Sequence, residues 1–284
     1  MRVSLQNEWA LFDALPGSAK RLLGASTLSA FTMPVVMVFV YAFILRGTRD
    51  VLQVMSFQFS LYVGIPVAFV LNRYLAGGRL GFGRLYAGGT VLCVLVLLGM
   101  TFLPALTRPS VLGMGLLMGV ATGLHWANRN YLSLVCTRDR MRNYYFGVES
   151  FFSCLGSVFV PAAAGAFISW WCRVDPSAAG TRAAYRWVGV AALALALGSA
   201  AFLANGVFPS ERPAIRVRAR YPVVWRRLLL LAVLKGTVHI FLMTSPAVLI
   251  IRVLGGHEGA LGLVQSIGAV AAAAVMYGIG RVAR

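Results

Sequence analysis

The chain has 284 residues, of which 59% are hydrophobic and only 12% are charged, and its mean hydropathy is +0.78. A soluble domain has about 25% charged residues, so this composition excludes a soluble protein. It predicts an integral membrane protein that crosses the bilayer several times. The net charge of +18 lies mostly in short connections between apolar runs and forms no basic domain. This distribution argues against a nucleic-acid partner and favours a role in membrane orientation.

The first 24 residues are expected to form a cytoplasmic segment. Leu5, Trp9 and Phe12 alternate with the acids Glu8 and Asp13, which fits a short amphipathic helix at the membrane interface. A solvated tail explains the same residues equally well. No small-residue cleavage site follows, so a removable signal peptide is not expected.

Eight apolar windows then follow, each long enough for a membrane-spanning helix, which needs about 20 mainly apolar residues. They cover residues 25–45, 51–72, 85–106, 110–135, 144–171, 185–208, 228–251 and 260–280. The windows are continuously apolar and lack the alternation of a membrane strand, which predicts helices. The expected fold class is therefore all-α, a polytopic membrane helix bundle.

Basic residues predict the orientation of this bundle. The N-terminal segment and the connections after the second, fourth, sixth and eighth helices hold 17 of the 26 basic residues. The opposite connections hold seven, so the positive-inside rule puts the N-terminus in the cytoplasm. The arginine-, alanine- and glycine-rich composition is typical of a GC-rich bacterial genome. We therefore expect a multi-pass protein of the bacterial cytoplasmic (plasma) membrane, in contact with the lipid bilayer.

The connection at residues 209–227 differs from the others, because it is longer, more basic and contains three prolines. It is predicted to be a cytoplasmic linker between an N-terminal six-helix unit, residues 25–208, and residues 228–284. Parallel six-helix repeats are one known plan for transporters. A weak internal echo agrees, since the first helix ends at Arg46 and the seventh ends at Arg252.

Three places in the chain resemble the major facilitator superfamily of transporters. In the loop after the second helix, Arg79 and Gly81 match the family pattern, but Gly78 stands where the family has an aspartate. The missing acid puts the family's charge-relay gate in question. The run GLLMGVATG at 115–123, leading to Arg142, is similar to the family's glycine-rich fourth helix and the loop after it. The arginine that many proton-coupled members carry before these glycines is absent.

The third place is the fifth helix, where the spacing of Gly147, Gly156, Pro161 and Gly165 resembles the antiporter signature of drug-exporting members. The family has twelve helices, so the resemblance covers about eight of them and implies a fragment or a truncated gene product. It implies a six-helix repeat plus the first two helices of a second, incomplete repeat. It also implies secondary active transport by alternating access, with Arg79, Gly81 and Arg142 at a cytoplasmic gating loop.

Intramembrane charge marks the first candidate site. A charge at mid-membrane costs at least about 2.5–3.5 kcal/mol, so it is usually paired or faces water. Arg129 lies ten residues before Asp139 in the turn, and Glu149 lies ten residues after it. An antiparallel hairpin places the two at similar depth, which predicts an ion pair between the fourth and fifth helices. A purely structural clamp, or an arginine that snorkels to the headgroups, explains Arg129 as well.

Polar neighbours extend this site along the fourth helix. His125 lies one turn from Arg129 on the same face, and Asn128 is adjacent. The family resemblance implies that this stripe faces a central cavity. For His125 alone, a hydrogen-bonded packing role is favoured over a proton site.

The seventh helix carries a second pair, Lys235 and His239, and the proline Pro246, which can bend it. If Glu149 neutralises Arg129, Lys235 has no acidic partner, and a positive cavity would favour an organic anion. The expected function is therefore secondary transport of a small molecule, with an organic anion as the preferred substrate class. Proton-coupled efflux of a drug or metabolite, with a coupling proton as second partner, is the first alternative. A non-transporting membrane scaffold or sensor is the second.

Enzyme classes are not supported by the sequence. It contains no phosphate-binding loop, no zinc-protease motif and no nucleophile elbow, and its eight acids are too few to suggest paired catalytic carboxylates. No cysteine or histidine spacing is typical of a metal site, and no cofactor is expected.

Overall fold

The computed structural model describes residues 5–76, 81–204 and 244–282, with scattered single residues between 206 and 238. Regular structure in these ranges is entirely helical, which confirms the all-α fold class. In chain order the elements are α1 (Leu5–Asp13), α2 (Gly17–Thr48), α3 (Val51–Ala76), α4 (Phe82–Phe102), α5 (Arg108–Cys136), α6 (Asp139–Val174), α7 (Ala178–Ala204), the π-helical turn η1 (Leu249–Val253) and α9 (Glu258–Val282).

Seven of the described helices, α2 to α7 and α9, are long and apolar enough to cross a membrane. Large apolar side chains also lie on the outer faces of the bundle, as Phe59 and Phe159 do, with 71% and 60% of their surfaces exposed. Such faces are unfavourable in water and favourable against lipid. The chain is therefore a multi-pass membrane protein.

Helix boundaries follow local capping chemistry more closely than they follow hydropathy. Helix α2 begins at Gly17 and includes the charged pair Lys20 and Arg21, so it starts within the segment that was expected to precede the membrane. Helix α4 ends at Phe102, four residues earlier than expected, because Pro104 disfavours a helical residue before it. Helix α7 begins at Ala178, seven residues earlier, because the Ser177 hydroxyl accepts the Gly180 N–H at 2.9 Å.

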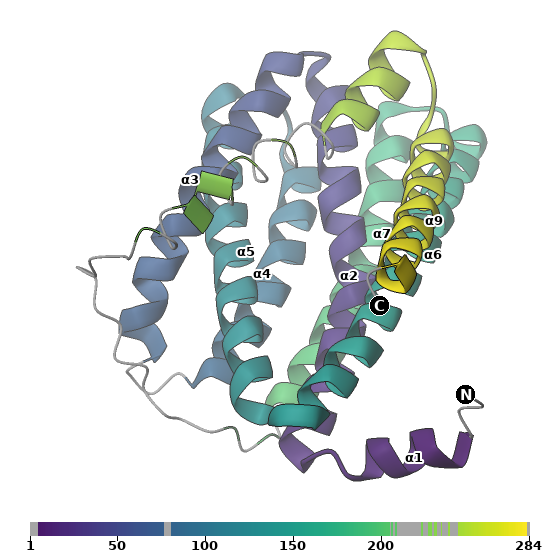
Figure 1. Cartoon of the computed structure of the whole chain (residues 1–284). Coiled ribbons are helices and arrows are strands. Elements are labelled where there is room, and N and C mark those ends of the chain that lie inside the picture. Colours follow the sequence, from purple (N-terminus) through teal and green to yellow (C-terminus); the bar gives the residue numbers. More distant parts are fainter. Residues whose placement is uncertain are drawn as a thin grey trace.

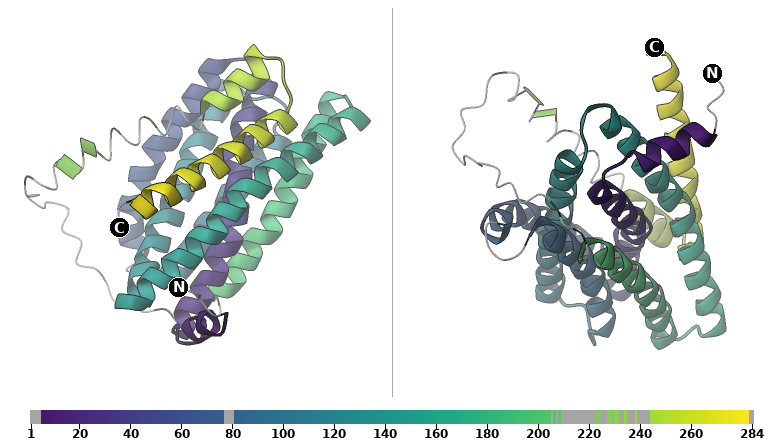
Figure 2. Two further views of the ribbon diagram at one scale, coloured as in Figure 1. Left: turned by 45° about the vertical axis from the view of Figure 1, so that its right-hand side comes forward. Right: turned by 90° about the horizontal axis from the view of Figure 1, so that it is seen from below.

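The helices form a continuous series of packed neighbours. Helix α3 packs on α5, α5 on α4, α4 on α7, α7 on α2, α2 on α6, and α6 on α9 (Figure 1). Helix α2 is the most buried, and its apolar side chains contribute much of the larger core. Helix α1 lies across the end of the bundle where α2 begins (Figure 2). This end of the bundle is called the α1 end, and the end where α2 finishes is called the far end.

Several expected features lie outside the described residues. These are Arg79, Lys235, His239 and nearly all of the linker 209–227. Of the seventh window, 228–251, the structure describes a helical segment from Thr244 to Val253, which contains Pro246, and only single residues before it. The division into a six-helix repeat and two further helices stays a prediction.

Candidate functional site

Helix α5 is fixed at its start by a reciprocal cap. The Thr107 hydroxyl accepts the Ser110 N–H, and the Ser110 hydroxyl accepts the Thr107 N–H at 2.9 Å, which satisfies two amides that the first turn leaves unpaired. The helix runs from this capped start, at the far end of the bundle, toward the α1 end (Figure 1). Its last three to four turns, which approach that end, carry the polar cluster of His125, Asn128 and Arg129.

Arg129 and Glu149 are in contact. Arg129 Nε lies 3.1 Å from Glu149 Oε1, and a terminal guanidinium nitrogen lies 3.1 Å from the same oxygen. The Glu149 side chain is only 5% exposed and that of Arg129 is 17% exposed. Tyr145, one turn earlier on α6, donates its hydroxyl to Glu149 Oε1 at 3.4 Å. The ion pair inferred from hairpin depth is therefore present, and a tyrosine supports its carboxylate.

The pair joins helices whose main packing partners differ. Helix α5 packs on α3 and α4, whereas α6 packs on α2 and α9. The Arg129 guanidinium also lies over the Trp126 ring, 4.8 Å from its centroid, which adds a cation–π contact on the exposed side. The cation is thus held between an acid and an aromatic face, and the helices are linked near the α1 end.

His125 has a local packing role. Its side chain is buried, its Nδ1 lies 2.9 Å from the Thr90 hydroxyl of α4, and its ring packs edge-on against Tyr86 with centroids 5.0 Å apart. Tyr86 in turn donates to Ser29 of α2 at 3.1 Å. The contacts of His125 are therefore with α4, which fits the packing role favoured for it.

Asn128 faces a third helix. Its Nδ2 donates to Asn72 Oδ1 of α3 at 2.8 Å and to the Leu124 carbonyl at 2.7 Å, while its own Oδ1 has no hydrogen-bond partner among the described residues. The three polar side chains of α5 thus contact three different helices: α4, α3 and α6. Their membership of a substrate or ion pathway stays a prediction.

The expected gating loop is described only in part. Gly81 precedes the first residue of α4 as its N-cap, in an extended conformation. Arg142 donates to the carbonyls of Leu134 and Thr137 at 3.2 and 3.0 Å, and so satisfies acceptors that the end of α5 leaves open. Arg142 therefore caps the end of α5, and its part in a gating loop stays a prediction.

The glycine and proline pattern of α6 divides into two groups. A Cβ at Gly156 would overlap the Ala30 carbonyl of α2, and one at Gly165 would overlap the Glu258 carbonyl of α9. The Pro161 carbonyl likewise faces Gly262 of α9, so these positions allow close helix contact. Among the described residues, a Cβ at Gly147 would meet nothing within 4 Å, and the packing role expected for that glycine stays a prediction.

A second buried acid was not singled out from the sequence. Glu258 opens α9 at the far end, and its side chain is 1% exposed. The Arg46 guanidinium, in the last turn of α2, binds both carboxylate oxygens: its Nε donates to Oε1, and its Nη2 lies 2.8 Å from Oε2. The Tyr185 hydroxyl of α7 donates to Oε1 at 2.9 Å. The cluster of Arg46, Tyr185 and Glu258 therefore joins three helices.

Two sequence signals point weakly to Glu258. It follows the pair Gly255-Gly256, which suits a turn, and an acid in the first turn of a helix is favoured by the helix dipole. Neither signal identifies Arg46, which is 212 residues away, as the partner of Glu258. Next to this cluster, Ser169 of α6 accepts the Gly259 N–H at 2.7 Å, which further fixes the start of α9.

Metal chemistry has no support in the described residues, because no three histidine, cysteine or acidic side chains converge there. Comparison with known proteins adds no assignment: neither a protein-family model nor a curated protein sequence matches the chain.

Proposed function

We propose that the chain is a secondary active transporter of the major-facilitator type, which moves a small organic anion across the bacterial cytoplasmic membrane by alternating access. The observation that carries this proposal is the cluster of Arg46, Tyr185 and Glu258. It joins α9, the helix assigned by the resemblance to the second repeat, to α2 and α7 of the first repeat. Alternating access requires contacts of this kind, which close one end of a bundle and can be broken.

The placement of the cluster supports a gate better than a general clamp. Helix α9 packs along α6, and in the described residues its contact with α2 is confined to a few positions. The ion pair lies at the far end, where Arg46 is 36% exposed. An arginine that is partly hydrated can leave its carboxylate at a smaller cost than one that is fully buried.

Anion transport is supported by the balance of charge. The two acids buried within or at the start of spanning helices, Glu149 and Glu258, are both bound by arginine. Among the described residues this leaves no unpaired buried carboxylate to attract a cation.

A reconstitution assay tests the proposal. The purified chain is placed in proteoliposomes on a solid-supported membrane, and currents are recorded after concentration jumps of citrate, glycerol 3-phosphate, choline and glycerol. We expect a transient current for at least one anion and none for glycerol, and we expect Glu258→Gln to change its rate. Asp50→Asn, which removes an acid at the same end, is the control.

The same vesicles separate the alternatives. A pH-sensitive dye trapped inside reports proton exchange, and a substrate-dependent pH change identifies proton-coupled antiport. A monodisperse, folded protein that moves none of a broad panel of anions, cations and neutral solutes would favour a scaffold or sensor and would contradict transport.

A further inference from the structure

The far end of the bundle contains a pocket of about 730 Å³. Pockets of about 300–1,000 Å³ are the size that holds small organic ligands. Its walls come from the end of α2, the end of α4 and the connection after it, the start of α7, and η1. The pocket is therefore built by helices assigned to the first repeat together with a segment assigned to the second.

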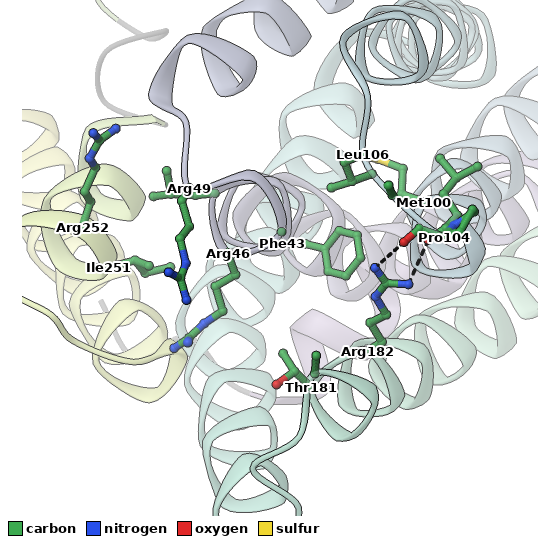
Figure 3. A pocket seen from close by; sticks show the side chains of 15 residues that line it. Phe43, Arg46, Arg49, Met100, Pro104, Leu106, Thr181, Arg182, Ile251 and Arg252 are labelled. Atoms are coloured by element: carbon green, nitrogen blue, oxygen red, sulfur yellow. Dashed lines mark hydrogen bonds between the residues drawn. The ribbon is translucent and has the colours of Figure 1, made fainter.

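Arginine dominates the charge of this pocket. Four arginines line it, namely Arg46, Arg49, Arg182 and Arg252, and no acid is among the lining residues (Figure 3). Two of the four are already bonded. Arg46 holds Glu258, and Arg182 donates to the Leu103 and Pro104 carbonyls at 3.0 and 2.9 Å.

The other two guanidinium groups are not bonded within the described part of the chain. Neither Arg49 nor Arg252 has an acid within 4 Å or a side-chain hydrogen bond there. The neighbouring acid Asp50 is occupied, because its Oδ1 accepts the Leu52 N–H at 2.9 Å. Figure 3 shows Arg49 extending toward Arg46, and such like charges repel each other unless an anion lies between them.

The backbone at Arg49 is a second, independent peculiarity. Arg49 ends α2 with a φ of 53°, and it is the only non-glycine residue with positive φ among the described residues. Glycine is the usual residue at such a helix end, because it has no Cβ to strain the left-handed conformation. Here an arginine occupies the position, and its side chain enters the pocket wall.

We propose that this pocket binds a small organic anion at the far-end mouth of the transport path. Arg49 donates charge-assisted hydrogen bonds to carboxylate or phosphate oxygens, which the planar guanidinium recognises well. Arg252 extends away from Arg49 in Figure 3, and it joins the same anion when its side chain turns toward Arg49. Arg46 adds positive potential, while Thr181, which also lines the pocket, already donates its hydroxyl to the Ser177 carbonyl at 3.2 Å. This assignment rests on the proposed function. It specifies the substrate class of the transporter and the site at which the substrate first binds.

The two repeats contribute different parts of this site. Arg49 belongs to the end of α2, and Arg252 belongs to η1, which is connected to α9 through residues 254–257. An anion held by both draws the two repeats together at the far end, where Arg46 and Glu258 already join them. Binding there therefore favours the conformation in which that end is closed.

A binding experiment on the purified chain tests the assignment. Citrate and glycerol 3-phosphate are titrated calorimetrically into protein in an uncharged detergent, with glycerol as the neutral probe. We expect at least one anion to bind, and to bind more weakly as sodium chloride is raised. In the double variant Arg49→Gln/Arg252→Gln its Kd should rise about tenfold or more, as expected for lost hydrogen bonds to a charged group.

The matched control is Arg108→Gln/Arg173→Gln, which removes two exposed arginines near the same end that do not line the pocket. Its Kd should stay within about twofold of the parent value. Equal weakening in both double variants would show a general charge effect and would overturn the proposal, as would absence of anion binding to the parent chain. Should the double variant aggregate, Arg252→Gln alone must weaken binding by about threefold or more, and unchanged affinity in it would also overturn the proposal.

A lipid headgroup offers the same phosphate chemistry, so a second arm uses nanodiscs of phosphatidylcholine or phosphatidylglycerol. A free-anion site keeps its citrate or glycerol 3-phosphate affinity in phosphatidylcholine. If phosphatidylglycerol instead copurifies with the parent chain, is lost from the Arg49→Gln/Arg252→Gln variant and is not displaced by either anion, the lipid is the ligand and the proposal fails.

The failure of this assignment is distinguishable from the failure of transport. Arginine-dependent binding without any current in proteoliposomes would leave the pocket in place and contradict the proposed function. Anion currents that keep their half-saturating concentration in Arg49→Gln/Arg252→Gln would leave transport in place and contradict the pocket.

Discussion

The Arg129 guanidinium and the Glu149 carboxylate lie 3.1 Å apart and link α5 to α6 near the α1 end of the bundle. The acid is almost fully buried, and the arginine is largely so. Because each charge is shielded from solvent mainly by its partner and the helices around it, removal of either one leaves the other uncompensated. The pair therefore has clear consequences for mutation.

Glu149→Gln should lower the free energy of unfolding by up to about 3–5 kcal/mol, because it leaves the Arg129 charge unpaired between helices. The exposed fraction of Arg129 places the effect at the lower end of that range. The exchange Arg129→Glu/Glu149→Arg should recover most of the loss. Thermal unfolding of the detergent-solubilised protein, followed by size-exclusion fluorescence, measures both.

Asp13→Asn is the matched control, because it breaks the exposed Asp13–Lys20 contact of 3.5 Å and should leave the melting temperature nearly unchanged. If the single variants melt like the parent, or if the exchange is no more stable than either single variant, the pair does not hold α5 to α6.

Thr90→Val should destabilise the protein by about 1–3 kcal/mol, since it leaves the ring nitrogen of buried His125 without its partner in a site of nearly unchanged shape. The control Thr122→Val, on α5 one turn from His125, removes only a weak contact to the Cys93 sulfur at 3.6 Å. Its melting temperature should change less. Equal effects would mean that the His125–Thr90 bond contributes nothing specific.

Local geometry explains what the sequence could predict about the α1 end. The pairing of Arg129 with Glu149 follows from counting residues outward from one short turn, and the antiparallel hairpin fixes the depth of both. The same reasoning could not assign the neighbours of His125 and Asn128. Side chains three or four positions apart share a helix face but differ in direction by about 40–60°, so the neighbouring helix that each one contacts depends on tertiary packing.

The far end could not be predicted in this way. Arg46 and Glu258 are 212 residues apart, and their contact depends on how α9 docks against α2 and α7. Hydropathy also places both residues outside the apolar windows, so in the sequence they look like ordinary charged residues of the loops between helices. The helices could be predicted because the length of an apolar run is a local property of the sequence. Whether a charged residue at a helix end forms an ion pair depends instead on the tertiary structure.

Gly119→Ala should weaken the contact between α3 and α5. A Cβ at Gly119 would overlap the Leu61 carbonyl, and Gly64 faces it from α3, so the backbones must separate. Overpacking of this kind costs about 1–3 kcal/mol. The matched substitution Gly113→Ala, on the same helix, meets nothing within 4 Å and should cost nothing. Equal melting temperatures for the two variants would contradict the close approach.

Glu258→Gln should open the far end, because it removes the charge that holds Arg46 and replaces the charged acceptor of the Tyr185 hydroxyl with a weaker, neutral one. Cys172, in the last turn of α6, is a native reporter of this change. Its thiol is half-buried and contacts the Thr181 hydroxyl at 3.7 Å on the wall of the far-end pocket. The other three cysteines are first replaced by alanine, and the rate of maleimide labelling at Cys172 is then measured.

A coupling of about 1–3 kcal/mol between the ion pair and the closed end predicts a labelling rate about fivefold or more above the parent in Glu258→Gln. Tyr185→Phe, which removes one hydrogen bond and keeps the ring, should give a smaller rise. Asp50→Asn removes an acid at the same end that bonds only its own turn, so it should label like the parent. If Glu258→Gln and Asp50→Asn label at the same rate, the ion pair does not keep the far end closed, and the gate would have to depend on other contacts of α9, such as the approach of Gly262 to Pro161.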